Sequence, residues 1–84
     1  MNLQGYKKLC GNTPLVKISE KVYGKLETYN PTGSVKDRMI SYVVGKALSA
    51  GLITDDTILC EATSGNTGIA LSATAAALGL ECHI

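Results

Sequence analysis

Apolar residues recur at four-residue spacing in the middle of the chain and predict a helix with one buried stripe. The stripe consists of Val35, Met39, Val43 and Ala47, with Ile40, Val44 and Leu48 beside them. Residues at this spacing lie one above the other on the same face of an α-helix. Ser34 is a good N-cap for the helix, and Gly51 is placed to end it at the C′ position. We therefore expect a helix that starts at Val35 and ends just before Gly51.

Shorter runs on both sides of this helix predict strands. Leu15–Ile18 is a short extended stretch, and Val22–Glu27 alternates loosely enough to form a strand. The run Thr57–Ala62 is β-branched at its start and mostly apolar, which is typical of a strand buried on both faces. After a further helix, Leu80–Ile84 begins another strand.

The order of these elements predicts an α/β fold with a parallel sheet and flanking helices. The second helix is the Ala-rich segment Ile69–Leu78, which Gly79 ends. Alternating strands and helices imply parallel pairing with right-handed crossovers. A chain that stops at the start of a strand leaves apolar surface uncovered. We therefore expect residues 1–84 to form a single partial domain, either the N-terminal portion of a longer protein or a remnant of one.

Composition and charge exclude several classes of function. The net charge is +1, the basic residues are scattered, and Trp and Phe are absent, so a nucleic-acid partner is not favoured. No apolar run is long enough to cross a membrane, and Met1–Gly5 is too polar for a signal peptide, which favours the cytoplasm. The three cysteines (Cys10, Cys60 and Cys82) include no C-x-x-C pair, which argues against a disulfide framework and a metal site and favours small buried thiols.

Lys36 lies in the first turn of the predicted helix and is the candidate catalytic residue. The helix macrodipole makes the local potential positive there, which disfavours a cation and favours the neutral amine, and Arg38 adds to this effect. Only a neutral amine attacks an aldehyde to form an imine. From the helix alone, an ordinary surface lysine beside two solvated charges, Asp37 and Arg38, explains the same residues.

The segment Thr63–Gly68 is a second candidate site, because it connects a predicted strand to a predicted helix. Backbone N–H groups at a helix N-terminus attract anions, and three hydroxyls and one amide suit the carboxylate of an amino acid. Gly65 and Gly68 let the backbone come close to a ligand. For the loop in isolation, a helix-capping turn formed by Thr67 stays open as an alternative. A phosphate loop is less favoured, because no G-x-x-x-x-G-K-[ST] motif is present.

Together, the two segments resemble a known enzyme family. Asn-Pro-x-x-Ser-Val-Lys-Asp-Arg at residues 30–38, followed by Thr-Ser-Gly-Asn-Thr-Gly at 63–68, resembles the cysteine synthase and cystathionine β-synthase family of fold-type II enzymes. Gly-Asn-Thr-Pro-Leu-Val at residues 11–16 resembles the opening motif of that family. The resemblance implies a tryptophan synthase β-like fold and pyridoxal 5'-phosphate as cofactor.

The resemblance also implies roles for individual residues. Lys36 matches the lysine that carries the cofactor as a Schiff base, and Asn66 matches the asparagine that hydrogen-bonds the phenolic oxygen of the cofactor ring. The substrate-binding residues implied in the same way are Thr63, Ser64, Gly65, Asn66 and Thr67. The glycine-rich cradle for the cofactor phosphate lies further along in family members, so we expect the 84 residues alone to be inactive.

The implied reaction is β-replacement, in which an activated serine such as O-acetylserine and sulfide give L-cysteine. The resemblance implies a homodimer for the full-length form. Serine and threonine dehydratases usually carry Ser-Phe-Lys and a shorter loop, so the sequence favours the sulfur branch; a cystathionine β-synthase stays an alternative. A rival of another class is an inactive remnant, or a module that binds a partner through its exposed sheet edge.

Overall fold

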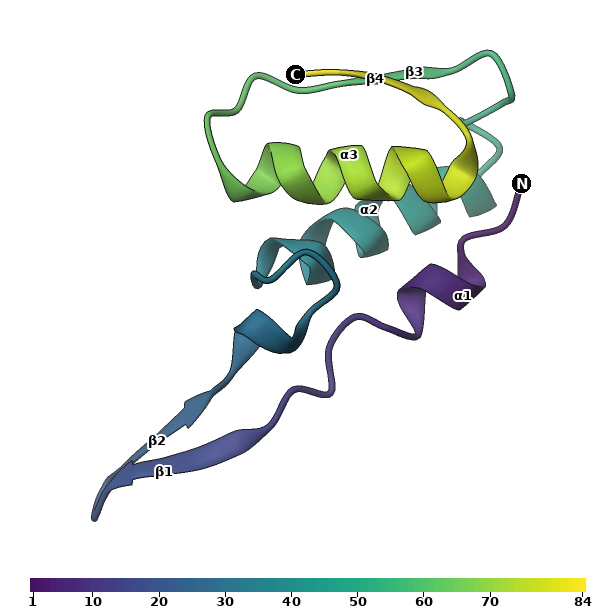
Figure 1. Cartoon of the computed structure of the whole chain (residues 1–84). Coiled ribbons are helices and arrows are strands. Elements are labelled where there is room, and N and C mark those ends of the chain that lie inside the picture. Colours follow the sequence, from purple (N-terminus) through teal and green to yellow (C-terminus); the bar gives the residue numbers. More distant parts are fainter.

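A computed structural model describes all residues 1–84 and shows an elongated molecule in which a hairpin projects from a body of helices and sheet (Figure 1). In the hairpin, β1 (Leu15–Ser19) pairs antiparallel with β2 (Val22–Lys25). The body consists of α2 (Lys36–Ser49), β3 (Ile58–Cys60), α3 (Asn66–Leu78) and β4 (Glu81–His83), with β3 parallel to β4. The short helix α1 (Gln4–Lys7) and the 3-10 turn η1 (Glu27–Tyr29) complete the chain.

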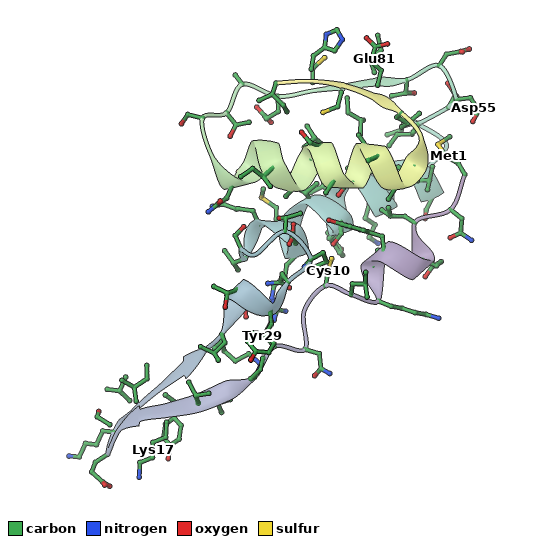
Figure 2. All side chains as sticks on the ribbon, viewed as in Figure 1. Met1, Cys10, Lys17, Tyr29, Asp55 and Glu81 are labelled. Carbon is green, nitrogen blue, oxygen red and sulfur yellow. The ribbon has the colours of Figure 1, made fainter.

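The predicted α/β class is confirmed, but one strand has a different partner from the one expected. β3 and β4 pair in parallel across α3, as the alternation of strands and helices indicated. The strand at Val22 instead pairs with β1 in a separate sheet. A short connection between consecutive strands favours antiparallel pairing, whereas parallel strands need a crossover of a dozen or more residues. Figure 2 shows Lys17 near the tip of this hairpin and Tyr29 at its base.

Helix α2 forms where the apolar spacing predicted it, with the predicted signals at both ends. It begins at Lys36, one residue later than expected, and the Ser34 hydroxyl oxygen accepts a hydrogen bond from the Lys36 N–H at 3.2 Å. The N-cap residue is therefore Val35, which makes no side-chain capping bond, rather than the predicted Ser34, although Ser34 still pairs one free helical N–H from the preceding position. The helix ends at Ser49, and Gly51 adopts φ 74°, a left-handed conformation that glycine tolerates.

Only half of the predicted stripe on α2 is buried. Ile40 and Val44 are 7% and 5% exposed and belong to the core with Ala70, Leu71 and Leu78 of α3. The other row of the stripe is about half exposed, at 49% for Val35, 45% for Met39 and 55% for Val43. The prediction for this row was wrong because α2 packs on α3 through the neighbouring row, and no other element covers this side of the helix.

The small parallel sheet is covered on one face only, which corrects the prediction of a strand buried on both faces. Figure 1 shows α2 and α3 on the same side of β3 and β4. Leu59 and Cys82 pack against the core, whereas Ile58 and Cys60 are exposed. Cys60 is therefore not a buried thiol, and Cys10 and Cys82 are only half-buried. Glu81 points away from the helices on the uncovered face (Figure 2).

None of the helices is long and apolar enough to cross a membrane.

Candidate active site

The side chain of Thr63 stabilises the loop after β3. It makes the capping hydrogen bonds that the sequence analysis gave to Thr67 as an alternative. The Thr63 hydroxyl oxygen accepts hydrogen bonds from the N–H groups of Gly65 at 3.2 Å and Gly68 at 3.3 Å. Helix α3 already begins at Asn66, so Thr67 lies within its first turn and makes no capping hydrogen bond. The Thr67 capping alternative was therefore wrong, and Thr63 keeps only its single O–H to donate to a ligand.

Gly68 allows three segments to meet at the start of α3. A Cβ atom at this position would lie 2.7 Å from Cγ2 of Thr63 and 3.2 Å from Cγ2 of Ile84. Any side chain would thus push the loop or the end of β4 away from the helix. At Gly65 no atom lies within 4 Å of such a Cβ, so this part of the loop faces open space.

An open depression of about 450 Å³ lies at the carboxyl ends of the two parallel strands. Its lining residues are Thr63, Ser64, Gly65, Gly68, Ile69, Ser72 and Ile84. Ligands of open α/β sheets bind at this edge, outside the carboxyl ends of the strands. The backbone N–H groups of Ser64, Asn66 and Thr67 donate to no group in the protein. These free donors at a helix N-terminus suit an anion.

Lys36 and the loop lie at the same end of the molecule, because α2 and α3 pack side by side and run in the same direction (Figure 1). The Lys36 side chain is half-buried, and its Nζ makes no hydrogen bond or ion pair. No hydrogen bond joins Lys36 to Asn66 or Thr67, and these three residues do not line the depression. The fold thus brings the two segments to one end and leaves the lysine amine without a partner.

Asp37 is a functional candidate that sequence reasoning missed. Its side chain is fully buried, although a solvated charge at the helix start was the alternative drawn from the sequence. The carboxylate accepts hydrogen bonds from the Thr32 N–H at 2.7 Å and from the Thr32 hydroxyl at 2.6 Å. The only signal in the sequence was a threonine five residues before an aspartate, and such a pair is too common to indicate a buried contact.

The Arg38 side chain also makes hydrogen bonds within the protein, in a network that joins the segment around residue 13 to α2. Its guanidinium donates to Glu27 with a shortest N–O distance of 2.5 Å and to the Thr13 hydroxyl at 3.1 Å. The hydrogen bond from Arg38 and a second from Thr13 lower the pKa of Glu27 from 4.5 to about 2. Asn30 donates to Glu27 and accepts from the Gly11 N–H at 2.7 Å. The network thus joins the segments at residues 11–13 and 27–30 to Arg38 on α2.

Comparison with known proteins identifies the family. A family model described as pyridoxal-phosphate dependent enzyme matches residues 6–84. The chain belongs to this family. It is 46% identical over 87 residues to a cysteine synthase of Aquifex aeolicus (strain VF5), an alignment that covers 92% of this chain and 27% of that protein.

Solved structures agree with this assignment. A hydrogen sulfide-producing enzyme from Fusobacterium nucleatum is 43% identical with a TM-score of 0.83, over 92% of this chain and 28% of that one. An O-acetylserine dependent cystathionine beta-synthase from Helicobacter pylori is 38% identical with a TM-score of 0.82, over 98% of this chain and 30% of that one. The chain therefore spans less than a third of the length of each of these relatives.

The residues present fit the aldehyde and the ring oxygen of the family's cofactor, pyridoxal phosphate. A cofactor with an aldehyde needs an amine that is not engaged in an ion pair, and the Lys36 amine meets this condition. The Asn66 side chain is exposed at the start of α3 and makes no hydrogen bond within the protein, so its amide is free for a ring oxygen.

Proposed function

We propose that residues 1–84 form a single partial domain of a pyridoxal-phosphate dependent cysteine synthase, and that this domain supplies the cofactor-bearing lysine and the substrate-carboxylate loop. The observation that carries the proposal is the common position of Lys36 and Thr63–Gly68 at the N-terminal ends of two packed helices (Figure 1). The loop Thr63–Gly68 follows β3 at the edge of the sheet where α/β enzymes bind their ligands, and Lys36 starts the helix packed beside it.

Lys36 is proposed to hold the cofactor covalently through its Nζ atom. The amine lacks an ion-pair partner, so its nucleophilic nitrogen is not blocked by a carboxylate. When bound, pyridoxal phosphate supplies an electron sink that allows the β-substituent of an amino acid to leave. The Lys36 amine, once released, is then the proposed base for the proton on the substrate α-carbon.

The loop is proposed to bind the carboxylate of the substrate. The free N–H groups of Ser64, Asn66 and Thr67 act as donors, and the hydroxyls of Thr63 and Ser64 can add charge-assisted hydrogen bonds. Gly65 leaves the approach open, and Asn66 is proposed to contact the ring oxygen of the cofactor. A depression of about 450 Å³ is large enough for an amino acid.

The proposed reaction combines an activated serine with sulfide to give L-cysteine, and the names of the relatives support the activated serine, the cysteine product and, as a product in one relative, sulfide. One relative is a cysteine synthase, a second is a hydrogen sulfide-producing enzyme, and a third is described as O-acetylserine dependent. O-acetylserine is therefore the proposed substrate, with acetate as the leaving group. The third relative also supports cystathionine formation as a second candidate. We further propose, from the resemblance alone, that the full-length form is a homodimer.

Covalent capture of the cofactor tests the assignment of Lys36. The chain is incubated with pyridoxal phosphate, reduced with borohydride and digested, and the tagged peptide is identified by mass spectrometry. We expect the tag mainly on Lys36, and a Lys36→Arg variant is expected to lose it. Lys46, on the same helix, is the internal control. A tag that is equally frequent on Lys46 and Lys36 contradicts the proposal.

A further inference from the structure

Three consecutive residues at the start of α2 are each bonded back to the preceding segment. The Lys36 N–H donates to Ser34, the Asp37 carboxylate accepts from Thr32, and the Arg38 guanidinium donates to Glu27. Lys36 is the first of these three residues, and its side chain is the only one of the three that makes no hydrogen bond or ion pair. Its backbone is therefore held, while its amine stays available.

Asp37 makes the most buried of these attachments. Its side chain has 0% exposure, and both of its carboxylate oxygens accept hydrogen bonds from Thr32, at 2.7 Å and 2.6 Å. Its neighbours on either side, Lys36 and Arg38, are half-buried and exposed, so Asp37 alone of the three faces the protein interior. A buried carboxylate needs such partners, and one that has them is fixed in place.

The same contacts keep the Asp37 carboxylate away from the amine of Lys36. A carboxylate paired with the Lys36 side chain would compete with any aldehyde for the amine nitrogen. In the structure, Asp37 is not within ion-pair distance of Lys36, because its carboxylate points inward to Thr32.

We propose that Asp37 is a positioning residue for Lys36: by binding Thr32, it fixes the turn from which the lysine side chain extends, and it keeps its charge away from the amine. The proposal rests on the proposed function of Lys36. Small displacements of a reacting group lower rates strongly, so a loose turn slows capture of an aldehyde. Thr32 and Asp37 act here as one unit.

Paired variants test the proposal in the full chain. Thr32→Val removes the hydroxyl, Thr32→Ser retains it, and Asp37→Asn removes the charge. Glu20→Gln is the control, because it removes a carboxylate from an exposed ion pair on the hairpin side of the molecule. Pyridoxal phosphate and borohydride label the lysines at a temperature where circular dichroism shows every variant folded. The readout is the ratio of label on Lys36 to label on Lys46, together with hydrogen exchange of the Thr32 amide.

We expect the Lys36 to Lys46 ratio to fall roughly tenfold in Asp37→Asn and Thr32→Val, and to be retained in Thr32→Ser and Glu20→Gln. Exchange of the Thr32 amide should accelerate in Asp37→Asn, because its acceptor is weakened. If Asp37→Asn does not fold, Thr32→Val is the variant that tests the proposal. Thr32 is only half-buried, so its replacement is less disruptive to folding.

The outcomes separate the two proposals. A ratio that is unchanged in folded Asp37→Asn or Thr32→Val, while wild-type Lys36 is labelled preferentially, overturns the positioning role alone. A wild-type ratio near one overturns the proposed function of Lys36 and this inference with it, and faster Thr32 exchange in Asp37→Asn would then show that the hydrogen bond is purely structural.

Discussion

At the scale of single residues, the polar side chains near the two helix starts fall into two groups. Ser34, Asp37 and Thr63 accept backbone N–H groups and so stabilise the turns. The side chains of Lys36 and Ser64 make no hydrogen bond or ion pair within the protein, as the proposed ligand-binding roles require. The division matters because a donor or acceptor already bonded within the protein offers less to a substrate.

Thr63 and Ser64 are adjacent, but replacing Thr63 should reduce the stability of the fold much more than replacing Ser64. Thr63→Ala removes the acceptor for two N–H groups and is expected to lower the free energy of unfolding by about 1 kcal/mol. Ser64→Ala removes an exposed hydroxyl and should change the free energy of unfolding by less than about 0.5 kcal/mol. Urea denaturation of both variants measures the difference. Equal destabilisation by the two substitutions would contradict the capping role of Thr63.

At the scale of elements, the contact between α2 and α3 sets the geometry of the site. The core lies between these helices, with Ile40 and Val44 facing Ala70 and Leu71. The first turn of α3 lies close to the loop and to the C-terminal strand, because Gly68 has no side chain and Thr63 and Ile84 pack against it. The parallel pairing of β3 and β4 requires the crossover helix α3 to return along the sheet, and α2, which precedes β3, runs in the same direction as α3 (Figure 1).

Two neighbouring valines on α2 test which face packs against α3. Val44 is 5% exposed and Val43 is 55% exposed. Val44→Ala deletes buried methyl groups and is expected to lower the free energy of unfolding by about 2 kcal/mol. Val43→Ala should be neutral or slightly stabilising, because alanine favours helix and little buried surface is lost. Thermal melts of the two variants decide this, and greater destabilisation by Val43→Ala would show that α2 packs through its other face.

At the scale of the whole molecule, one polar network connects the hairpin side to the helical body. Glu27 follows the hairpin and bonds Arg38 on α2, while Thr13 precedes the hairpin and bonds both. The hairpin itself has exposed apolar side chains and no helix over it (Figure 2). The network therefore fixes the direction in which the hairpin leaves the body.

This network should make stability depend on pH in acid. The pKa of Glu27 is about 2 in the folded chain and 4.5 without its partners, so the unfolded chain binds the proton more readily. Its stabilising contribution is complete above pH 4.5 and is lost as the pH falls toward 2. We expect the difference in melting temperature between wild type and Glu27→Gln to shrink across this window.

The control for that experiment is Glu20→Gln, which alters an exposed ion pair with Lys17. Exposed pairs contribute little, so its melting temperature should follow that of the wild type at each pH. A constant gap between wild type and Glu27→Gln from neutral pH to pH 2 would contradict the assigned pKa of Glu27.

The local sequence by itself predicted α2 and α3, their C-terminal ends and the family, but it predicted neither α1 nor the start of α3 at Asn66, three residues before Ile69. The four-residue spacing around Val44, the hydroxyl of Ser34 and the glycines at 51 and 79 act within one or two turns, so their effect does not depend on distant residues. The motifs at residues 30–38 and 63–68 identified the family for the same reason, because each is a continuous segment. The roles of Lys36 and Asn66 stay predictions.

Tertiary structure alone decided which faces are buried and where the charges go. Val43 and Val44 are identical side chains on one helix, and only the position of α3 distinguishes them. The pairing of β2 with β1, and the covering of the β3–β4 sheet on one face only, depend on how separate segments pack together. The residue pattern of a single segment does not encode this packing. Asp37 is buried because the chain folds back to place Thr32 against it, since a carboxylate leaves water only where donors meet it.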